Sequence, residues 1–286
     1  MKQPWTVGVV QLQSTADVAA NLTQAETLIR QGAAAGAEAL FLPEGFAYLG
    51  PLAGRLAIAE ALPPVGSRAS AGPLLSWAQH LAQSLKVELF LGGFPEALDH
   101  ARTYNTALHL DRDGRLKGAY RKLHLFSVDL PDGTRLDEGE NTGAGEQLVL
   151  TERQGFTVGL AICYDLRFPL LFERQRMQGA TVLTVPSAFT ESTGRAHWHP
   201  LLRARAIEQQ CWLIAAAQCG DHGSGRRSYG HSLVLDPWGR VVLDLGEAPA
   251  VGLATLTESA LSRARGALPA LTHRRPLSAL PCGESC

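Results

Sequence analysis

Cys163 stands at the end of an apolar segment, where a thiol could act as a nucleophile. The preceding residues read FTVGLAI and predict a buried strand, and LLFERQRMQ shortly afterwards predicts a helix. Unpaired backbone N–H groups and the dipole at a helix start favour a thiolate over a thiol. Free cysteine is also among the most buried residue types, so a purely structural thiol is the alternative interpretation of Cys163.

Two charged residues also stand where apolar segments end. Glu44 follows AEALFLP, and α/β sheets assemble their sites at the carboxyl ends of strands. Lys122 lies within YRKLHLF, where burial would disfavour its charge unless an anion pairs with it. A carboxylate, an ammonium and a thiol could together cleave an acyl bond, but each charge alone could equally be an ordinary surface residue.

The elements that must position these residues alternate between strands and helices. Hydrophobic periodicity predicts a strand over 7–13, a helix over 16–34, a second helix over 74–85 and another strand over 87–94. The segments 106–120 and 232–246 each contain two alternating arms around a turn and predict hairpins. Antiparallel pairs among βα units indicate an α/β fold with mixed sheets. The stretch 127–145 is rich in Asp, Gly and Glu and predicts a long functional loop.

Composition favours a small-molecule partner. The 286 residues fit a single domain over 1–277 with a loose tail over 278–286. The 26 Lys and Arg nearly balance the 27 Asp and Glu, so no strong field indicates nucleic acid or an acidic membrane. No secretory signal and no apolar run of about 18 residues stands in the chain, which predicts a cytoplasmic protein. Five cysteines without a CxxC pair favour free thiols over a disulfide framework: Cys163, Cys211, Cys219, Cys282 and Cys286.

Taken together, the three charged or nucleophilic segments resemble the carbon–nitrogen hydrolase, or nitrilase, superfamily. Its catalytic signatures recur as LPEGF with Glu44, YRKLHLF with Lys122 and ICYDLRFP with Cys163, in the family's order. The resemblance extends from Val7 to Pro276 and implies a four-layer α-β-β-α sandwich whose subunits pair across helices beside the site. The second half, with PSAFTESTGRAHWHPLLRARAIEQQ and SYGHSLVLDPWG, is similar to the branch that contains deaminated glutathione amidase and omega-amidase.

The resemblance implies an amidase that works without a cofactor, through a thioester on Cys163. Glu44 would carry the proton, which requires a pKa raised by partial burial. Lys122 and the backbone N–H of Tyr164 would hold the oxyanion.

Further site residues follow from the same resemblance. A second glutamate in the 127–145 loop would orient Lys122, and the motif position falls on Glu138, with Glu140 as the alternative. Arg167 could bind a substrate carboxylate in bidentate fashion, or could instead form a surface ion pair. The acyl pocket is expected to use backbone groups after a strand end and two side chains of the next loop: Ser187, Ala188, Phe189, Arg195 and His197.

The implied substrate is deaminated glutathione, cleaved to 2-oxoglutarate and cysteinylglycine. Omega-amidase action on 2-oxoglutaramate or 2-oxosuccinamate is the close alternative, and nitrile or carbamoyl hydrolysis a more distant one. A non-catalytic binding protein and a papain-like protease using His124 or His231 belong to other classes. The pair His197 and His199 has no nearby cysteine or carboxylate in the sequence, so no metal site is predicted.

Overall fold

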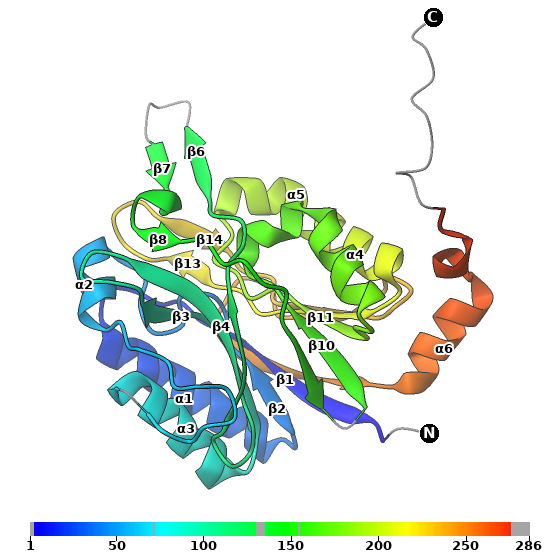
Figure 1. Cartoon of the computed structure of the whole chain (residues 1–286), viewed down its shortest axis with the longest axis horizontal. Coiled ribbons are helices and arrows are strands. Elements are labelled where there is room, and N and C mark those ends of the chain that lie inside the picture. The colour runs from blue at the N-terminus through cyan, green and yellow to red at the C-terminus, as the bar shows by residue number, and fades with distance from the viewer. Residues whose placement is uncertain (1–2, 71, 130–134, 154, 276–286) are drawn as a thin grey trace, which may run out of the picture.

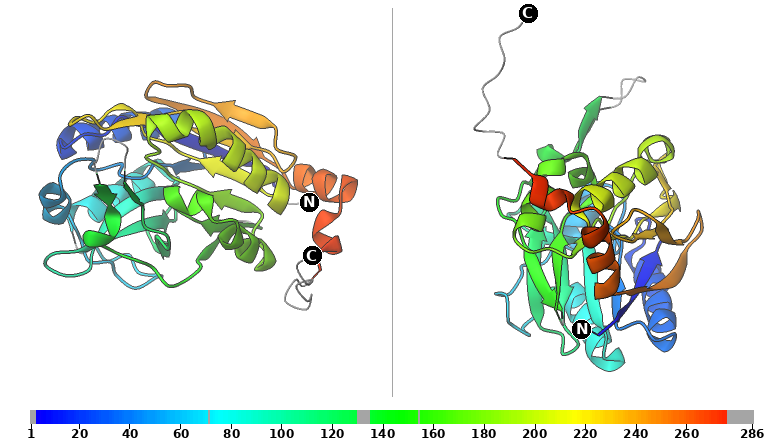
Figure 2. Two further views of the ribbon diagram at one scale, coloured as in Figure 1. Left: turned by 90° about the horizontal axis from the view of Figure 1, so that it is seen from above. Right: turned by 90° about the vertical axis from the view of Figure 1, so that its right-hand side faces the viewer.

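The computed structural model describes residues 3–70, 72–129, 135–153 and 155–275. Within these ranges two mixed β-sheets face each other, and helices cover the outer face of each (Figures 1 and 2). The architecture is therefore the four-layer α-β-β-α sandwich with two mixed sheets that the sequence predicts. The expected tail over 278–286 lies outside the described residues.

The described strands form two large sheets and two small ones. The first sheet has the order β17 (Ala250–Leu256), β1 (Trp5–Gln11), β2 (Ala39–Phe41), β3 (Glu88–Ala97), β4 (Thr103–Leu110) and β5 (Leu116–Arg121), with β8 (Thr142–Gly143) beside β4. The second has the order β16 (Val241–Asp244), β15 (Leu233–Leu235), β12 (Trp212–Ala215), β11 (Val182–Thr184), β10 (Phe156–Leu160) and β9 (Leu150–Arg153). The two small sheets pair β6 (Ser127–Asp129) with β7 (Arg135–Asp137), and β13 (Cys219–Asp221) with β14 (Arg227–Tyr229).

Helices pack on the outer faces of both sheets. The first sheet is covered by α1 (Val18–Ala34) and α3 (Pro73–Leu85), and the second by α4 (Pro169–Met177) and α5 (Glu191–Gln209). The remaining helices are α2 (Leu52–Ala57), α6 (Glu258–Ala267) and short 3₁₀ segments at Glu138–Glu140, Cys163–Arg167 and Ala270–His273. No helix of the described ranges combines the length and apolarity needed to cross a membrane.

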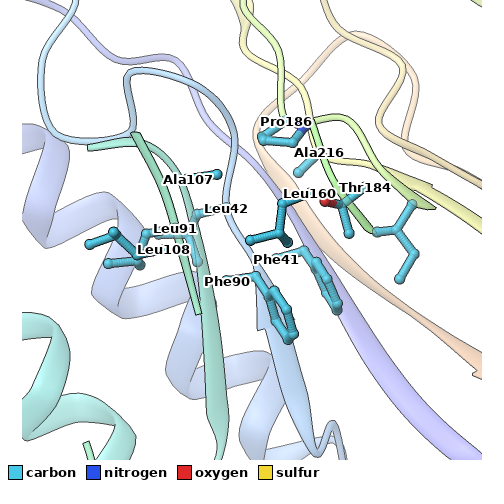
Figure 3. Close-up of a pocket in the computed structure, with 11 residues that line it drawn as sticks. Phe41, Leu42, Phe90, Leu91, Ala107, Leu108, Leu160, Thr184, Pro186 and Ala216 are labelled. Atoms are coloured by element: carbon cyan, nitrogen blue, oxygen red, sulfur yellow. The ribbon is translucent and has the colours of Figure 1, made fainter. Parts of the chain in front are cut away.

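Strand alternation explains why the first sheet is buried on both faces. Along β1, Val7 and Val9 contact the core between the sheets, whereas Val10 contacts the core beneath the helices. Figure 3 shows Phe41 and Phe90 of the first sheet near Leu160 of the second, around a cavity of about 10 Å³. This volume is no larger than one water molecule needs, so the sheets pack closely and hold their strand ends at fixed positions.

Most of the predicted elements are present. The helix expected over 16–34 is α1, and the two predicted hairpins are β4–β5 and β15–β16, both antiparallel. The stretch 127–145 is not a structureless loop, because its described residues contain β6, β7, a 3₁₀ turn and β8. The ladder between β6 and β7 supplies hydrogen bonds that turn-rich composition does not reveal.

Candidate active site

Two carboxylates and an amide surround a buried ammonium. Lys122 directly follows β5 and its side chain is only 2% exposed. Its Nζ donates to Glu44 Oε1 at 3.1 Å and to Glu138 Oε2 at 2.7 Å. Asn105 on β4 donates from Nδ2 to both carboxylates, to Glu44 Oε1 at 2.8 Å and Glu138 Oε1 at 2.9 Å. The ammonium therefore has the anionic partners that its burial requires.

Of the two glutamates considered in the 127–145 stretch, the structure brings Glu138 to Lys122. Glu138 begins the 3₁₀ turn after β7, and its Oε2 also accepts the Phe126 backbone N–H at 2.9 Å. Glu140, two residues later, is exposed. The orientation of this short turn separates the two side chains, which spacing in the sequence alone could not do.

Cys163 lies between the two sheets and is 9% exposed. Its backbone has a φ of 47°, in the left-handed region that L residues rarely adopt, and its N–H donates to Pro186 O at 3.0 Å. Such strain at a single non-glycine residue is typical of positions where the surrounding structure aims a functional side chain. The thiol interacts with the Glu44 carboxylate and with the Ala188 backbone N–H.

The charge state of Cys163 differs from the sequence-based expectation. Cys163 begins a five-residue 3₁₀ segment, and the first full helix, α4, begins only at Pro169. Burial raises the pKa of the thiol, and the negative charge of Glu44 raises it further, whereas Lys122 lowers it by less. The Glu44 and Glu138 carboxylates contact Lys122, and the partly buried Arg55 guanidinium also interacts with both of them. Burial and the charge of Glu44 therefore favour the protonated thiol over the thiolate.

The prediction of a raised pKa for Glu44 is wrong. Burial does act to raise the pKa of this carboxyl, but the charge of Lys122, the Cys163 thiol and the Ala188 N–H outweigh it. Together with the amide of Asn105 they hold the pKa of Glu44 well below its ordinary value. In the free chain the site thus places an ionised Glu44 carboxylate beside a protonated Cys163 thiol.

Gly93 makes room for these side chains. Its φ is +65°, and a Cβ added there would lie 2.7 Å from Gly45 N and 3.0 Å from Glu44 Cγ. Any larger residue would therefore displace the segment that carries Glu44. The pair Gly92-Gly93 inside an apolar strand was a signal in the sequence for such a close approach.

A second buried carboxylate supports the nucleophile segment. Asp165 is fully buried and accepts four hydrogen bonds: from Tyr120 Oη at 2.7 Å, from Ile162 N at 2.9 Å, and from His124 at its backbone N, 3.0 Å, and its Nδ1, 2.7 Å. These bonds connect the segment before Lys122 to the segment around Cys163. Sequence reasoning missed Asp165 and Asn105, because a single Asp or Asn near a motif carries no spacing signal.

The residues expected to bind substrate divide into two groups. Arg167 lies over the Phe189 ring at 5.1 Å and its Nη1 is 3.4 Å from His197 Nδ1. No carboxylate of the described residues pairs with Arg167. These three residues are therefore brought together, and the Arg167 guanidinium is available to an anion.

The other expected contacts have different partners. The Ser187 N–H and C=O both bond to neighbouring strand residues, at 2.8 Å each, and the Ala188 N–H donates to Glu44 Oε2 at 2.9 Å. The Ser187 N–H and C=O and the Ala188 N–H therefore hold the structure of the site together. Arg195 and His197 lie within α5, which begins at Glu191, and not on a loop. Arg195 is 59% exposed and bonds Glu191 Oε1 at 2.8 Å.

A four-layer sandwich with a polar cluster at the carboxyl ends of its strands defines an α/β enzyme whose buried thiol, carboxylates and ammonium are built for acyl chemistry. The model of the carbon–nitrogen hydrolase family matches residues 6–265. The chain belongs to this family and is an amide-hydrolysing enzyme.

Similar proteins cover nearly the whole chain. A deaminated glutathione amidase of Synechocystis is 38% identical over 95% of this chain and 98% of its own length. The human deaminated glutathione amidase is 42% identical over 94% of this chain and 82% of its own length. The crystal structure of the C. elegans NitFhit protein is 37% identical, with a TM-score of 0.88, over 96% of this chain and 66% of that one.

Proposed function

We propose that the chain hydrolyses an amide bond of a small carboxylate-bearing substrate through a thioester on Cys163. One observation carries the proposal: the Glu44 carboxylate accepts a hydrogen bond from the Lys122 ammonium at 3.1 Å and also interacts with the Cys163 thiol. A base that touches both the nucleophile and the positive group can move one proton without changing the net charge of the cluster. Such proton transfer at constant charge suits a buried site.

Acylation would begin when Cys163 Sγ attacks the amide carbonyl carbon and its proton passes to Glu44. The tetrahedral oxyanion would be held by Lys122 Nζ and by the backbone N–H of Tyr164, which directly follows the nucleophile. Each well-placed donor contributes roughly 3–4 kcal/mol to such a step. Glu138 and Asn105 hold the ammonium and the base in place and need not touch the substrate.

The same groups would complete acylation and then carry out deacylation. The protonated Glu44 gives its proton to the departing nitrogen as the C–N bond breaks, which leaves an acyl thioester on Cys163. Glu44 then takes a proton from water, the hydroxide adds to the thioester carbonyl, and the C–S bond breaks. The proton on Glu44 returns to the sulfur, so the resting thiol is restored.

Two observations support a carboxylate-bearing substrate. The Arg167 guanidinium follows the nucleophile by four residues and has no carboxylate partner among the described residues. Relatives that align over nearly the whole chain are named deaminated glutathione amidase. We therefore propose deaminated glutathione as the substrate, with 2-oxoglutarate and cysteinylglycine as the products.

Intact-protein mass spectrometry tests this assignment. The enzyme is mixed with deaminated glutathione, 2-oxoglutaramate or 2-oxosuccinamate and quenched in acid within the first turnovers. With deaminated glutathione we expect an adduct of the 2-oxoglutaryl mass on Cys163. We also expect the highest kcat/KM with this substrate. An adduct with higher kcat/KM on 2-oxoglutaramate would make the chain an omega-amidase, and turnover without any adduct on Cys163 would contradict the thioester.

Replacing Arg167 with Met tests how the carboxylate is bound. Charge-assisted hydrogen bonds contribute about 1.5–3 kcal/mol, so kcat/KM for the carboxylate-bearing substrate should fall about 10- to 100-fold. Turnover of a neutral amide such as propionamide should change little. Arg174→Met, which removes an exposed arginine from α4, is the matched control. Equal losses on charged and neutral amides would mean that Arg167 supports the fold and not the substrate.

We further propose that the enzyme works in the cytoplasm as a homodimer. The described cysteines Cys163, Cys211 and Cys219 are free, which suits a reducing compartment. Leu170 and Met177 of α4 are 69% and 70% exposed, and Ile207 of α5 is 46% exposed. Large apolar side chains exposed on adjacent helices favour a subunit interface there.

A further inference from the structure

Three potential metal ligands meet on the surface of the second sheet, away from the candidate active site. They are His199 in α5, His231 just before β15, and Asp244 at the end of β16. Their ligand atoms all lie within 4.8 Å of one another. The side chains are 32%, 21% and 33% exposed, so the cluster is open to ions from solvent.

The two distances from Asp244 Oδ2 match those within one coordination shell. Asp244 Oδ2 lies 3.3 Å from His199 Nε2 and 3.2 Å from His231 Nδ1. Tetrahedral zinc with bonds of about 2.0–2.1 Å separates its ligand atoms by roughly 3.3–3.4 Å. An ion could therefore replace the hydrogen bonds between these three side chains with little movement of their backbones.

The surrounding structure fixes two of these ligands in orientation. Asp244 Oδ1 accepts the Gly246 backbone N–H at 2.9 Å and also lies 2.9 Å from His231 Nδ1, whereas Oδ2 lies within reach of both histidines. The backbone N–H of His231 donates to Gly246 O at 2.6 Å, and the backbone carbonyl of His231 accepts a hydrogen bond from Trp198 Nε1 at 2.8 Å. Glu247 Oε1 lies 3.8 Å from His231 Nε2, the nitrogen opposite the ligand atom.

We propose that this chain binds one divalent transition-metal ion, zinc in particular, through His199 Nε2, His231 Nδ1 and Asp244 Oδ2. Water would occupy the fourth position. Two imidazole nitrogens favour zinc, cobalt or nickel over calcium or magnesium, which prefer oxygen ligands. The ion would connect α5 to the β15–β16 hairpin, and it shares no residue with the Glu44, Lys122 and Cys163 cluster, so the proposal stands independently of the proposed function.

Metal titration of the full chain, after treatment with a chelator, tests the proposal. We expect calorimetry to show one zinc ion per chain and Co²⁺ to develop the visible absorption of tetrahedral cobalt. His199→Ala and Asp244→Asn should each weaken binding at least about tenfold. The melting temperature should rise with zinc in the unmutated chain and not in these variants.

Two controls separate this site from other metal ligands. His100→Ala removes an exposed histidine elsewhere and should leave the affinity unchanged. Cys163→Ala removes a thiol that could also bind zinc and should leave the cobalt spectrum unchanged. Absence of saturable binding would overturn the proposal, as would affinity that survives both His199→Ala and Asp244→Asn in variants with unchanged circular dichroism.

Discussion

Cys163→Ala loses turnover by about 10⁴-fold or more, because no other group can form the acyl intermediate. Substrate binding should persist, since Lys122, Glu138 and Glu44 keep their mutual hydrogen bonds without the thiol. Stopped assays with deaminated glutathione measure the loss of kcat. Equilibrium calorimetry with the same substrate measures the retained affinity.

The matched control for this variant is Cys219→Ala. Cys219 is also buried, and burial raises its pKa to about 11, but no carboxylate or ammonium of the described residues perturbs it. Turnover and the acyl adduct should survive this change. Residual activity of Cys163→Ala within about tenfold of the unmutated enzyme would mean that water attacks the amide directly, and the thioester would have to be abandoned.

Glu44→Gln should separate the reactivity of the thiol from catalysis. Turnover should fall about 10²- to 10⁴-fold, since the glutamine cannot carry a proton. Alkylation of Cys163 by iodoacetamide should instead become faster at neutral pH. The reason is that Glu44 is one of the groups that raise the pKa of the thiol, whereas Lys122, which lowers it, remains.

The pH dependence of alkylation shows whether Glu44→Gln lowers the pKa of the Cys163 thiol. In the unmutated enzyme the raised pKa of Cys163 should confine fast alkylation to strongly alkaline solution. In Glu44→Gln the same rise should occur at lower pH. Glu140→Gln, which neutralises an exposed glutamate nearby, should leave both the profile and turnover unchanged. If alkylation slows together with turnover, the Glu44 charge does not hold the proton on the sulfur.

Local patterns in the chain were sufficient for most of the fold. Helix α1 and the two hairpins follow from apolar periodicity and turn residues within a few positions of each other. Arg195 and His197 were expected on a loop and lie in α5, because the segment Glu191–Trp198 carries mixed polar residues and Pro200 follows. Its helical form depends on packing against β12, β14 and β15, which the segment alone does not show.

The charge states of the site could not be predicted from residue types. The expectations of a thiolate at Cys163 and a raised pKa at Glu44 both came from considering each residue alone. In the folded chain the two groups interact with each other and with Lys122, and the sign of each pKa shift depends on the others. The directions of these pKa shifts therefore depend on how the fold places the three groups next to one another.

The sequence by itself determined the family, the layered architecture and the three signature residues Glu44, Lys122 and Cys163, because signatures and periodicity are local properties. The family resemblance placed the second glutamate at Glu138 with Glu140 as the alternative, and only the tertiary structure shows the Glu138 side chain directed at Lys122. The tertiary structure also brings together His199, His231 and Asp244, which lie in three separate segments of the chain. Contacts between distant segments arise from how the sheets and helices pack, and no local spacing encodes them.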